Sequence, residues 1–168
     1  MQQTNTGTEG SQAAVATLSP AQDTAVRQSF ARQGLMRHWD ARIEHLAPGR
    51  ADIRLPHSER VSQQQGSFHG GAMGALADIA AGYAAMTVAP EGMEVTTVEY
   101  KINFLAACRG GTLLARGRVL RTGRRIIVTA ADVVHQADDG RETLCAVMQQ
   151  TIMPVPKADG APLPEAAR

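Results

Sequence analysis

The stretch from Gln63 to Ala80, QQQGSFHGGAMGALADIA, opens the most apolar segment of this 168-residue chain. From Gly70 to Pro90 the only charged side chain is Asp78, and most of the other residues are alanine or glycine. An acidic residue at the centre of a membrane span costs about 2.5 to 3.5 kcal/mol on insertion scales. The segment is therefore predicted to be a helix buried in a globular domain, not a membrane span.

A helical wheel places Asp78 at the centre of a stripe of small residues. At about 100° per residue, six of them fall on its side of the helix: Gly71, Gly74, Ala75, Ala81, Gly82 and Ala85. Large side chains, among them Met73, Leu76 and Tyr83, fall on the opposite side and are predicted to pack into the core. Small residues allow a ligand or another backbone to come close. Asp78 is thus a candidate site residue, although it could instead cap a neighbouring backbone or pair with an arginine.

Period-2 and helical patterns surround this segment. Pro20 to Gln33 is predicted to be a helix with Ser19 as its N-cap and Gly34 as its stop. A hairpin follows, with strands around Trp39–Glu44 and Ala51–Leu55 joined at Pro48-Gly49. After the central helix, alternation predicts four more strands, at about 94–105, 112–121, 125–136 and 142–153.

This order predicts an α+β fold in which an antiparallel sheet wraps around one long central helix. Residues 1–20 and 154–168 are polar or interrupted by proline and are predicted to be disordered tails around a domain at 21–153. A single sheet leaves an edge and a face uncovered, so a homodimer is expected.

Charge and cysteine content limit the function classes. A net charge of +1 gives no electrostatic case for nucleic acid or for an anionic membrane. Cys108 and Cys145 show no metal-ligand spacing, which predicts neither a disulfide framework nor a zinc site and fits a reducing compartment. Residues 1–25 contain no Lys or Arg and no apolar run, so a cytoplasmic protein is expected.

Phe68-His69-Gly70-Gly71 marks the start of the central helix. The first-turn amides of a helix have no partners within the helix, and the positive end of its dipole lies behind them. Glycines let a carbonyl oxygen approach the main chain, which is what an oxyanion hole requires. A Gly-Gly helix start could also serve packing alone.

The string from Gln63 to Ala80 resembles the HGG(x)4-LAD-x-A signature of the PaaI-type (phenylacetate-degradation) hotdog thioesterases. The resemblance extends over about residues 30–153 and includes the strand order and the segment VTTVEYKINFLAA after the helix. It implies a hotdog fold and hydrolysis of acyl- or aryl-coenzyme A, with coenzyme A as part of the substrate and no separate cofactor. It also implies active sites shared across a homodimer, commonly assembled into a homotetramer.

The resemblance assigns roles to residues around the helix start. Asp78 corresponds to the family's general base or nucleophile, and the amide of Gly70 to the group that polarises the thioester carbonyl. Gly71 supports the turn. His69 lies where the family holds the loop or the substrate, although a lone histidine beside an apolar helix is more often a local hydrogen bonder. Phe68 lies near the expected pocket.

Two further positions match the family less tightly. Gln63 falls where related enzymes place Asn or Gln near the reacting carbonyl and the attacking water. Thr97 matches a Ser/Thr that orients this water from the partner subunit, with Thr96 as the alternative because the alignment needs a gap.

Five arginines cluster around one predicted hairpin: Arg116, Arg118, Arg121, Arg124 and Arg125. Arginine forks suit the phosphates of coenzyme A, and Arg121, Arg124 and Arg125 are the candidates for that role. A solvated hairpin face is the alternative interpretation.

Two other functions stay open at this point. Hydratases of this fold pair an Asp with a His five residues on, a spacing that Asp52 and His57 show outside the central helix. A non-catalytic module that senses acyl-coenzyme A would keep the pocket without needing Asp78. The acyl group is not determined by the sequence, and phenylacetyl, hydroxybenzoyl and medium-chain groups all remain candidates.

Overall fold

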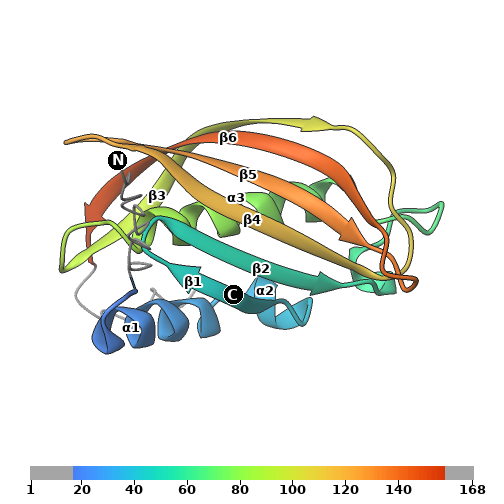
Figure 1. Cartoon of the computed structure of the whole chain (residues 1–168), viewed down its shortest axis with the longest axis horizontal. Coiled ribbons are helices and arrows are strands. Elements are labelled where there is room, and N and C mark those ends of the chain that lie inside the picture. Colours follow the sequence, from blue (N-terminus) through green and yellow to red (C-terminus); the bar gives the residue numbers. More distant parts are fainter. Residues whose placement is uncertain (1–16, 158–168) are drawn as a thin grey trace, which may run out of the picture.

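The computed structural model describes residues 17–157, which form a six-stranded antiparallel sheet curved around the helix α3, Gly70–Met86 (Figure 1). The strand order is β1-β2-β4-β5-β6-β3. The remaining elements are α1 (Pro20–Ala31), α2 (Gly34–His38), β1 (Arg42–Ala47), β2 (Arg50–Pro56), the 3₁₀ turn η1 (Glu59–Val61), β3 (Met93–Phe104), β4 (Thr112–Thr122), β5 (Ile127–Gln136) and β6 (Glu142–Pro156). The predicted hotdog fold is confirmed.

The core lies between α3 and the inner face of the sheet. Because side chains alternate along a strand, every second residue of β4 and β5 points at the helix, and these residues are fully buried: Leu113, Ala115, Ala131 and Val133. They meet Leu76, Ala77 and Ala80 on α3. Each buried leucine contributes about 1.5 to 3 kcal/mol relative to an exposed one, so this layer holds the helix in the sheet.

Gly117 of β4 is where the sheet comes closest to the helix backbone. A Cβ added to Gly117 would lie 2.3 Å from the carbonyl oxygen of Ala80 and 2.7 Å from the amide nitrogen of Ala81. Only glycine fits there, so main chain packs directly on main chain at this point.

The helix α1 packs beside the second half of α3. Ser19 caps it as predicted, in a capping box with Gln22. Its apolar side is buried through Val26 and Phe30, and the Phe30 ring meets the Tyr83 ring edge-on with centroids 5.6 Å apart. This contact places α1 over the part of α3 that follows Asp78.

The structure differs from the prediction after α1. Gly34 does not end the helical region but begins α2, whose single fully buried side chain is Met36. Asp40 then takes a left-handed backbone conformation (φ 57°), and the amide of Ala41 bonds to the carbonyl of Met36. This helix-ending turn delays the first strand until Arg42, beyond the predicted start at Trp39.

The last strand runs further than predicted, to Pro156 instead of 153. Beyond Ile152 only β3 pairs with β6. The backbone nitrogens of Pro154 and Pro156, which carry no hydrogen, can therefore face the side of β6 that has no neighbouring strand. No hydrogen bond of the sheet is lost there. The predictions of disorder for 1–16 and 158–168 lie outside the described residues.

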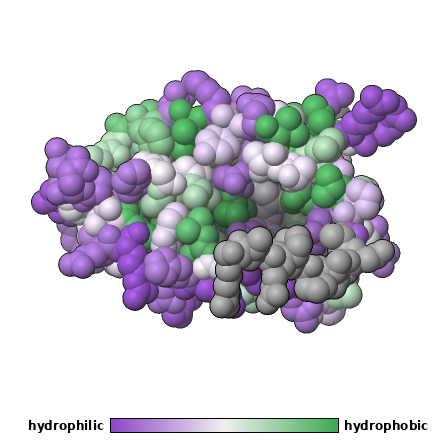
Figure 2. All heavy atoms as spheres, turned by 180° about the vertical axis from the view of Figure 1, so that it is seen from behind, coloured by the Kyte–Doolittle hydropathy of each residue, from purple (hydrophilic) through white to green (hydrophobic). Residues whose placement is uncertain are grey.

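The edge strand β3 carries several large exposed apolar side chains. Val98, Tyr100 and Phe104 are 58%, 45% and 54% exposed. Seen from behind, the surface shows separate hydrophobic patches between hydrophilic ones (Figure 2).

Within residues 17–157 no helix is long and apolar enough to cross a membrane.

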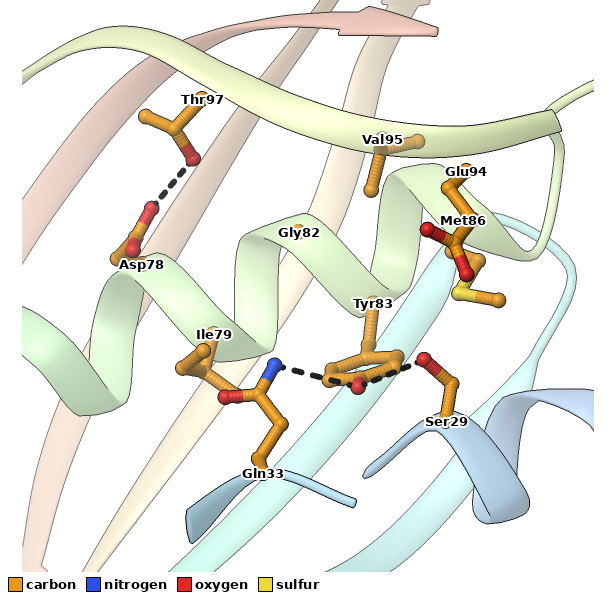
Figure 3. A pocket seen from close by; sticks show the side chains of 10 residues that line it. All are labelled: Ser29, Gln33, Asp78, Ile79, Gly82, Tyr83, Met86, Glu94, Val95 and Thr97. Atoms are coloured by element: carbon orange, nitrogen blue, oxygen red, sulfur yellow. Dashed lines mark hydrogen bonds between the residues drawn. The ribbon is translucent and has the colours of Figure 1, made fainter. Parts of the chain in front are cut away.

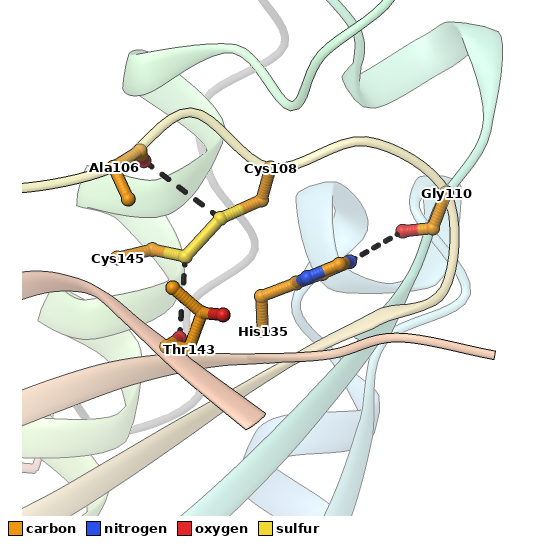
Figure 4. The surroundings of a disulfide bond; sticks show 6 residues. All are labelled: Ala106, Cys108, Gly110, His135, Thr143 and Cys145. Atoms are coloured by element: carbon orange, nitrogen blue, oxygen red, sulfur yellow. Dashed lines mark hydrogen bonds between the residues drawn. A yellow bond between two sulfur atoms is a disulfide. The ribbon is translucent and has the colours of Figure 1, made fainter. Parts of the chain in front are cut away.

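Cys108 and Cys145 form a disulfide, which the sequence analysis did not predict (Figure 4). Cys108 lies in the loop after β3 and Cys145 lies in β6, and both are buried. Pairing of Phe104 with Ala146 at the end of the β3–β6 ladder brings the two cysteines together across 37 residues. The expectation that the two cysteines form no disulfide framework was therefore wrong, and these residues no longer support a reducing compartment.

Candidate active site

Asp78 lies half-buried on the open side of α3, at the wall of a cavity of about 210 Å³ (Figure 3). The cavity lies between α1, the second half of α3 and the start of β3. Its lining residues are Ser29, Gln33, Asp78, Ile79, Gly82, Tyr83, Met86, Glu94, Val95 and Thr97. Asp78 is therefore an acid at the edge of a hollow that both polar and apolar side chains line.

One oxygen of the Asp78 carboxylate is held by two donors. The hydroxyl of Thr97 donates to Oδ1 over 2.7 Å, and the side-chain amide of Gln150 donates to the same oxygen. The amide also donates to Thr97 Oγ1, at 2.7 Å. Thr97, not Thr96, is thus the threonine beside Asp78, and it reaches the carboxylate within one chain instead of from a partner subunit.

Gln150 is the residue of this group that sequence reasoning missed. It lies on the inner face of β6, in the row Ala146, Met148, Gln150 and Ile152. A polar residue in an otherwise apolar inward row was a usable signal, because burying an amide is costly unless it finds partners. Which partner it finds depends on the pairing of β6 with β3, and that pairing cannot be read from the strand alone.

The stripe of small residues around Asp78 is narrower than predicted. Ala81 and Ala85, expected beside Asp78, are fully buried. The sheet accounts for the burial of Ala81, because β4 approaches its backbone closely at Gly117. Gly74 is buried as well, and the residues of α3 that stay at least partly accessible are Gly70, Gly71, Ala75, Asp78, Ile79, Gly82 and Met86.

Gly70 begins α3, and within residues 17–157 its backbone N–H donates no hydrogen bond. The neighbouring amide of Gly71 donates to Nδ1 of His69 over 2.8 Å, so His69 is the N-cap of the helix. This is the local hydrogen-bonding role that was the alternative for His69. It leaves the Gly70 amide as an available donor at the positive end of the helix dipole.

The residues around Gly70 line a second cavity, of about 330 Å³. A Cβ added to Gly70 would stand 3.4 Å from the Phe104 ring, so this ring lies close to the start of the helix. The lining residues are Gln63, Phe68, Gly70, Met73, Phe104, Leu105, Ala106 and Ala107. The structure thus brings together the predicted residues Gln63, Phe68 and Gly70.

The two cavities do not form one site within a chain. Gly70 and Asp78 are eight residues apart on a straight helix, which separates them by about 12 Å along the axis. A single carbonyl group cannot contact both. The predicted pairing of the Gly70 amide with the Asp78 carboxylate therefore requires two chains.

The arginine cluster is not brought to either cavity. Arg116 pairs with Glu142 over 3.1 Å and Arg118 with Asp132 over 2.7 Å. The Gln136 amide and, to a smaller extent, Arg116 lower the pKa of the Glu142 carboxyl below its usual value. Arg121, Arg124 and Arg125 are exposed at the end of β4 and in the turn that follows, and they line neither cavity.

The Asp52–His57 pair that could indicate a hydratase is not assembled. Asp52 binds Arg50 over 2.8 Å, and this ion pair raises the pKa of Arg50. His57 instead bonds through Nε2 to the carbonyl of Gly66 at 3.1 Å. His135 is held in the same way by the carbonyl of Gly110, beside the disulfide (Figure 4). In the described part of the chain, no three His, Cys, Asp or Glu side chains are grouped so that they could hold a metal ion.

Comparison with known proteins agrees with this architecture. Residues 65–141 match the family model of the thioesterase superfamily. A curated protein of Saccharolobus solfataricus that carries a provisional esterase name is 38% identical over 53% of this chain, which spans 63% of that protein's length. The chain thus spans less than two thirds of this curated relative.

Solved structures cover more of the chain. The crystal structure of a thioesterase family protein from Silicibacter pomeroyi is 37% identical, with a TM-score of 0.78 over 81% of this chain and 99% of that one. The PaaI protein of the E. coli phenylacetic acid degradation operon shares the fold, at 20% identity and a TM-score of 0.72 over 83% and 96% of the two chains. The family match and the Silicibacter structure together show that this chain belongs to the thioesterase superfamily.

Proposed function

We propose that this protein is a PaaI-type thioesterase that hydrolyses acyl- or aryl-coenzyme A to the free acid and coenzyme A. The observation that carries the proposal is the Asp78 carboxylate, held through Oδ1 by Thr97 and Gln150 at the edge of a cavity. A carboxylate fixed through one oxygen offers the other one to a substrate or a water molecule. Membership of the thioesterase superfamily supports thioester hydrolysis as the reaction.

A complete site takes Asp78 from one chain and the Gly70 amide from a second. The two groups lie about 12 Å apart along α3, and each faces its own cavity. The exposed apolar residues of the edge strand β3 support a homodimer that covers this side of the molecule. The homotetramer that the resemblance implies remains part of the proposal.

Hydrolysis with Asp78 as the general base takes two steps. Asp78 takes a proton from water as the oxygen attacks the thioester carbon, and the carbonyl oxygen becomes an oxyanion on the Gly70 N–H. The oxyanion then re-forms the carbonyl, the carbon–sulfur bond breaks, and the coenzyme A sulfur leaves with the proton that Asp78 had taken from water, which restores the carboxylate. One oxyanion donor contributes on the order of 10² to 10³ in turnover.

Asp78 could instead attack the carbon directly and form an anhydride that water hydrolyses. Both routes need the same carboxylate beside the same carbon. After a single turnover in ¹⁸O-water, label in the Asp78 side chain identifies the anhydride route, because general-base hydrolysis puts the label only in the product acid. No cofactor is needed in either route.

In this proposal the acyl group occupies the cavity beside Asp78. Ile79, Met86 and Val95 supply apolar contacts there, and Glu94 lies in the same wall. Tyr83, five residues after Asp78 and about 7.5 Å further along the helix axis, lines the same cavity.

The far end of this cavity is polar. The hydroxyl of Tyr83 donates to Ser29 Oγ over 3.2 Å and accepts from the Gln33 amide over 3.3 Å (Figure 3). An acyl group with a hydroxyl at its far end could join this group of hydrogen bonds, while a plain hydrocarbon end could not. Among the candidate esters, the pocket therefore favours hydroxylated ones such as hydroxybenzoyl-coenzyme A.

Release of free thiol tests the proposed function. A panel of aryl- and fatty acyl-coenzyme A esters is incubated with the wild type, with Asp78→Asn, and with Asp139→Asn as a control from the β5–β6 turn. Wild type and control should release thiol, and Asp78→Asn should lose at least about 10²-fold in kcat. If the wild type binds esters without hydrolysing any of them, the protein is an acyl-coenzyme A-binding module and the proposal fails.

A further inference from the structure

Gln150 is a fully buried polar side chain behind the Asp78 carboxylate. It has 0% exposure and lies between Met148 and Ile152 on the inner face of β6. It pairs with Tyr100 of β3 on one side and Thr129 of β5 on the other, so it sits in the interior of the sheet. An apolar residue would pack there without any desolvation cost.

The donors and acceptors fix the orientation of this amide. A carboxylate only accepts hydrogen bonds, so the group that Gln150 presents to Asp78 Oδ1 must be its NH₂. Its second N–H reaches Thr97 Oγ1, which leaves the Thr97 proton for Asp78. Behind it, the fully buried Thr129 donates to the Gln150 carbonyl over a long 3.5 Å. Both N–H groups of the Gln150 amide therefore point at Asp78 or at Thr97, which also binds the carboxylate.

The arrangement treats the two carboxylate oxygens differently. Oδ1 accepts from both Thr97 and Gln150, whereas Oδ2 accepts no hydrogen bond from any residue between 17 and 157. Hydrogen bonds to an ionised group are strong, and two of them on one oxygen restrict rotation of the carboxylate. The orientation of Oδ2 is then set from inside the sheet, before substrate arrives.

We propose that Gln150 is a positioning residue of this enzyme: it holds the Asp78 carboxylate and Thr97 in one arrangement so that Oδ2 faces the thioester carbon or its water. The proposal rests on the proposed thioesterase function. It assigns no contact between Gln150 and substrate, so Gln150 should affect kcat and not KM. A merely structural role would instead affect the free energy of unfolding.

The test replaces Gln150 by methionine, which has a similar length and no donor. The matched control is Gln149→Met on the same strand, where the side chain is exposed on the opposite face. Gln150→Met should lower kcat about 10- to 100-fold, leave KM near the wild-type value, and leave the melting temperature unchanged or higher. Gln149→Met should change none of the three.

Two further measurements keep the test decisive. Gln150→Glu has the same length but presents an oxygen where the NH₂ was, so it should lose kcat as methionine does, and it decides the question if the methionine variant does not fold. A crystal structure of either variant should show the Asp78 side chain in more than one rotamer. An active wild type with unchanged kcat in both variants would overturn the positioning role and leave the thioesterase proposal standing. A wild type that hydrolyses no ester would overturn both.

Discussion

The hydroxyl of Thr97 on β3 donates to Oδ1 of Asp78 on α3 over 2.7 Å, within a single chain. An edge strand and the central helix are therefore joined at the candidate catalytic group itself. Because the donor is in place without substrate, the carboxylate is oriented in advance. Preorganised hydrogen bonds of this kind need no rearrangement during the reaction.

Replacing Thr97 by valine should reduce turnover without unfolding the protein. Valine has the shape of threonine but no hydroxyl, so Asp78 would keep only the Gln150 amide on Oδ1. We expect kcat to fall about tenfold, the usual size of one hydrogen bond to a charged group. Thr96→Val is the matched control and should keep wild-type kcat in the same thiol-release assay. Equal losses in the two variants would show that the contact with Asp78 is not what matters.

Tyr83→Phe should change which esters are preferred. The variant removes the hydroxyl that Ser29 and Gln33 bind at the far end of the cavity. We expect kcat/KM to fall about tenfold for 4-hydroxybenzoyl-coenzyme A and to stay near the wild-type value for benzoyl-coenzyme A. The two esters differ only in the hydroxyl, so each serves as the control for the other. A parallel loss for both would place the acyl group elsewhere.

Two glycine replacements should affect stability in opposite directions. Gly117→Ala forces a Cβ to within 2.3 Å of the Ala80 carbonyl oxygen, and we expect it to lower the free energy of unfolding by about 1 to 3 kcal/mol or more. Gly82→Ala has nothing within 4 Å of its added Cβ and should raise it by up to about 1 kcal/mol, since alanine is the better helix former. Urea unfolding followed by circular dichroism measures both. A stable Gly117→Ala variant would contradict the close contact between β4 and α3.

Reducing the disulfide should destabilise the domain. The bond closes a loop across 37 residues, and cross-linking a loop of that size stabilises the folded state by about 3 to 4 kcal/mol in the chain-entropy model. The wild type should therefore melt at a lower temperature after reduction with dithiothreitol. A double variant with Cys108→Ala and Cys145→Ala should melt at one temperature in both conditions. If complete reduction left the melting temperature of the wild type unchanged, the disulfide would not be stabilising the fold.

Local patterns in the sequence were enough to predict most of the fold. Alternation predicted β3, β4 and β5 to within about two residues, because one face of each strand packs on α3 and the other does not. Ser19 was predicted as an N-cap from its place just before a helical pattern, and the structure confirms it in a capping box with Gln22. The prediction that Gly34 ends the helical region was wrong because the chain turns there and continues as the helix α2. Met36 holds α2 in place through contacts with residues distant in sequence.

The candidate site was predicted where its residues lie on one segment, and beyond that segment only for Thr97, which the family resemblance supplied. Gln63, Phe68 and Gly70 lie close together in the sequence and line the same cavity. The contact between Asp78 and Gln150 spans 72 residues, and the cysteine pair spans 37. Both depend on how β6 is registered against β3, which includes an irregularity between Thr97 and Glu99. Alternation along one strand shows which of its residues face inward, but it does not name the residue that each one meets on the neighbouring strand.

The distance between Gly70 and Asp78 on α3, about 12 Å, has a consequence for how the protein behaves in dilute solution. If each complete site draws one group from each of two chains, an isolated chain contains none. Activity per milligram should then depend on total protein concentration by mass action, and should decline once the protein is diluted below the dissociation constant of its dimer. The activity per milligram and the particle mass, which light scattering measures over the same dilution series, should fall together. The amount of active enzyme would thus be set by assembly as well as by synthesis.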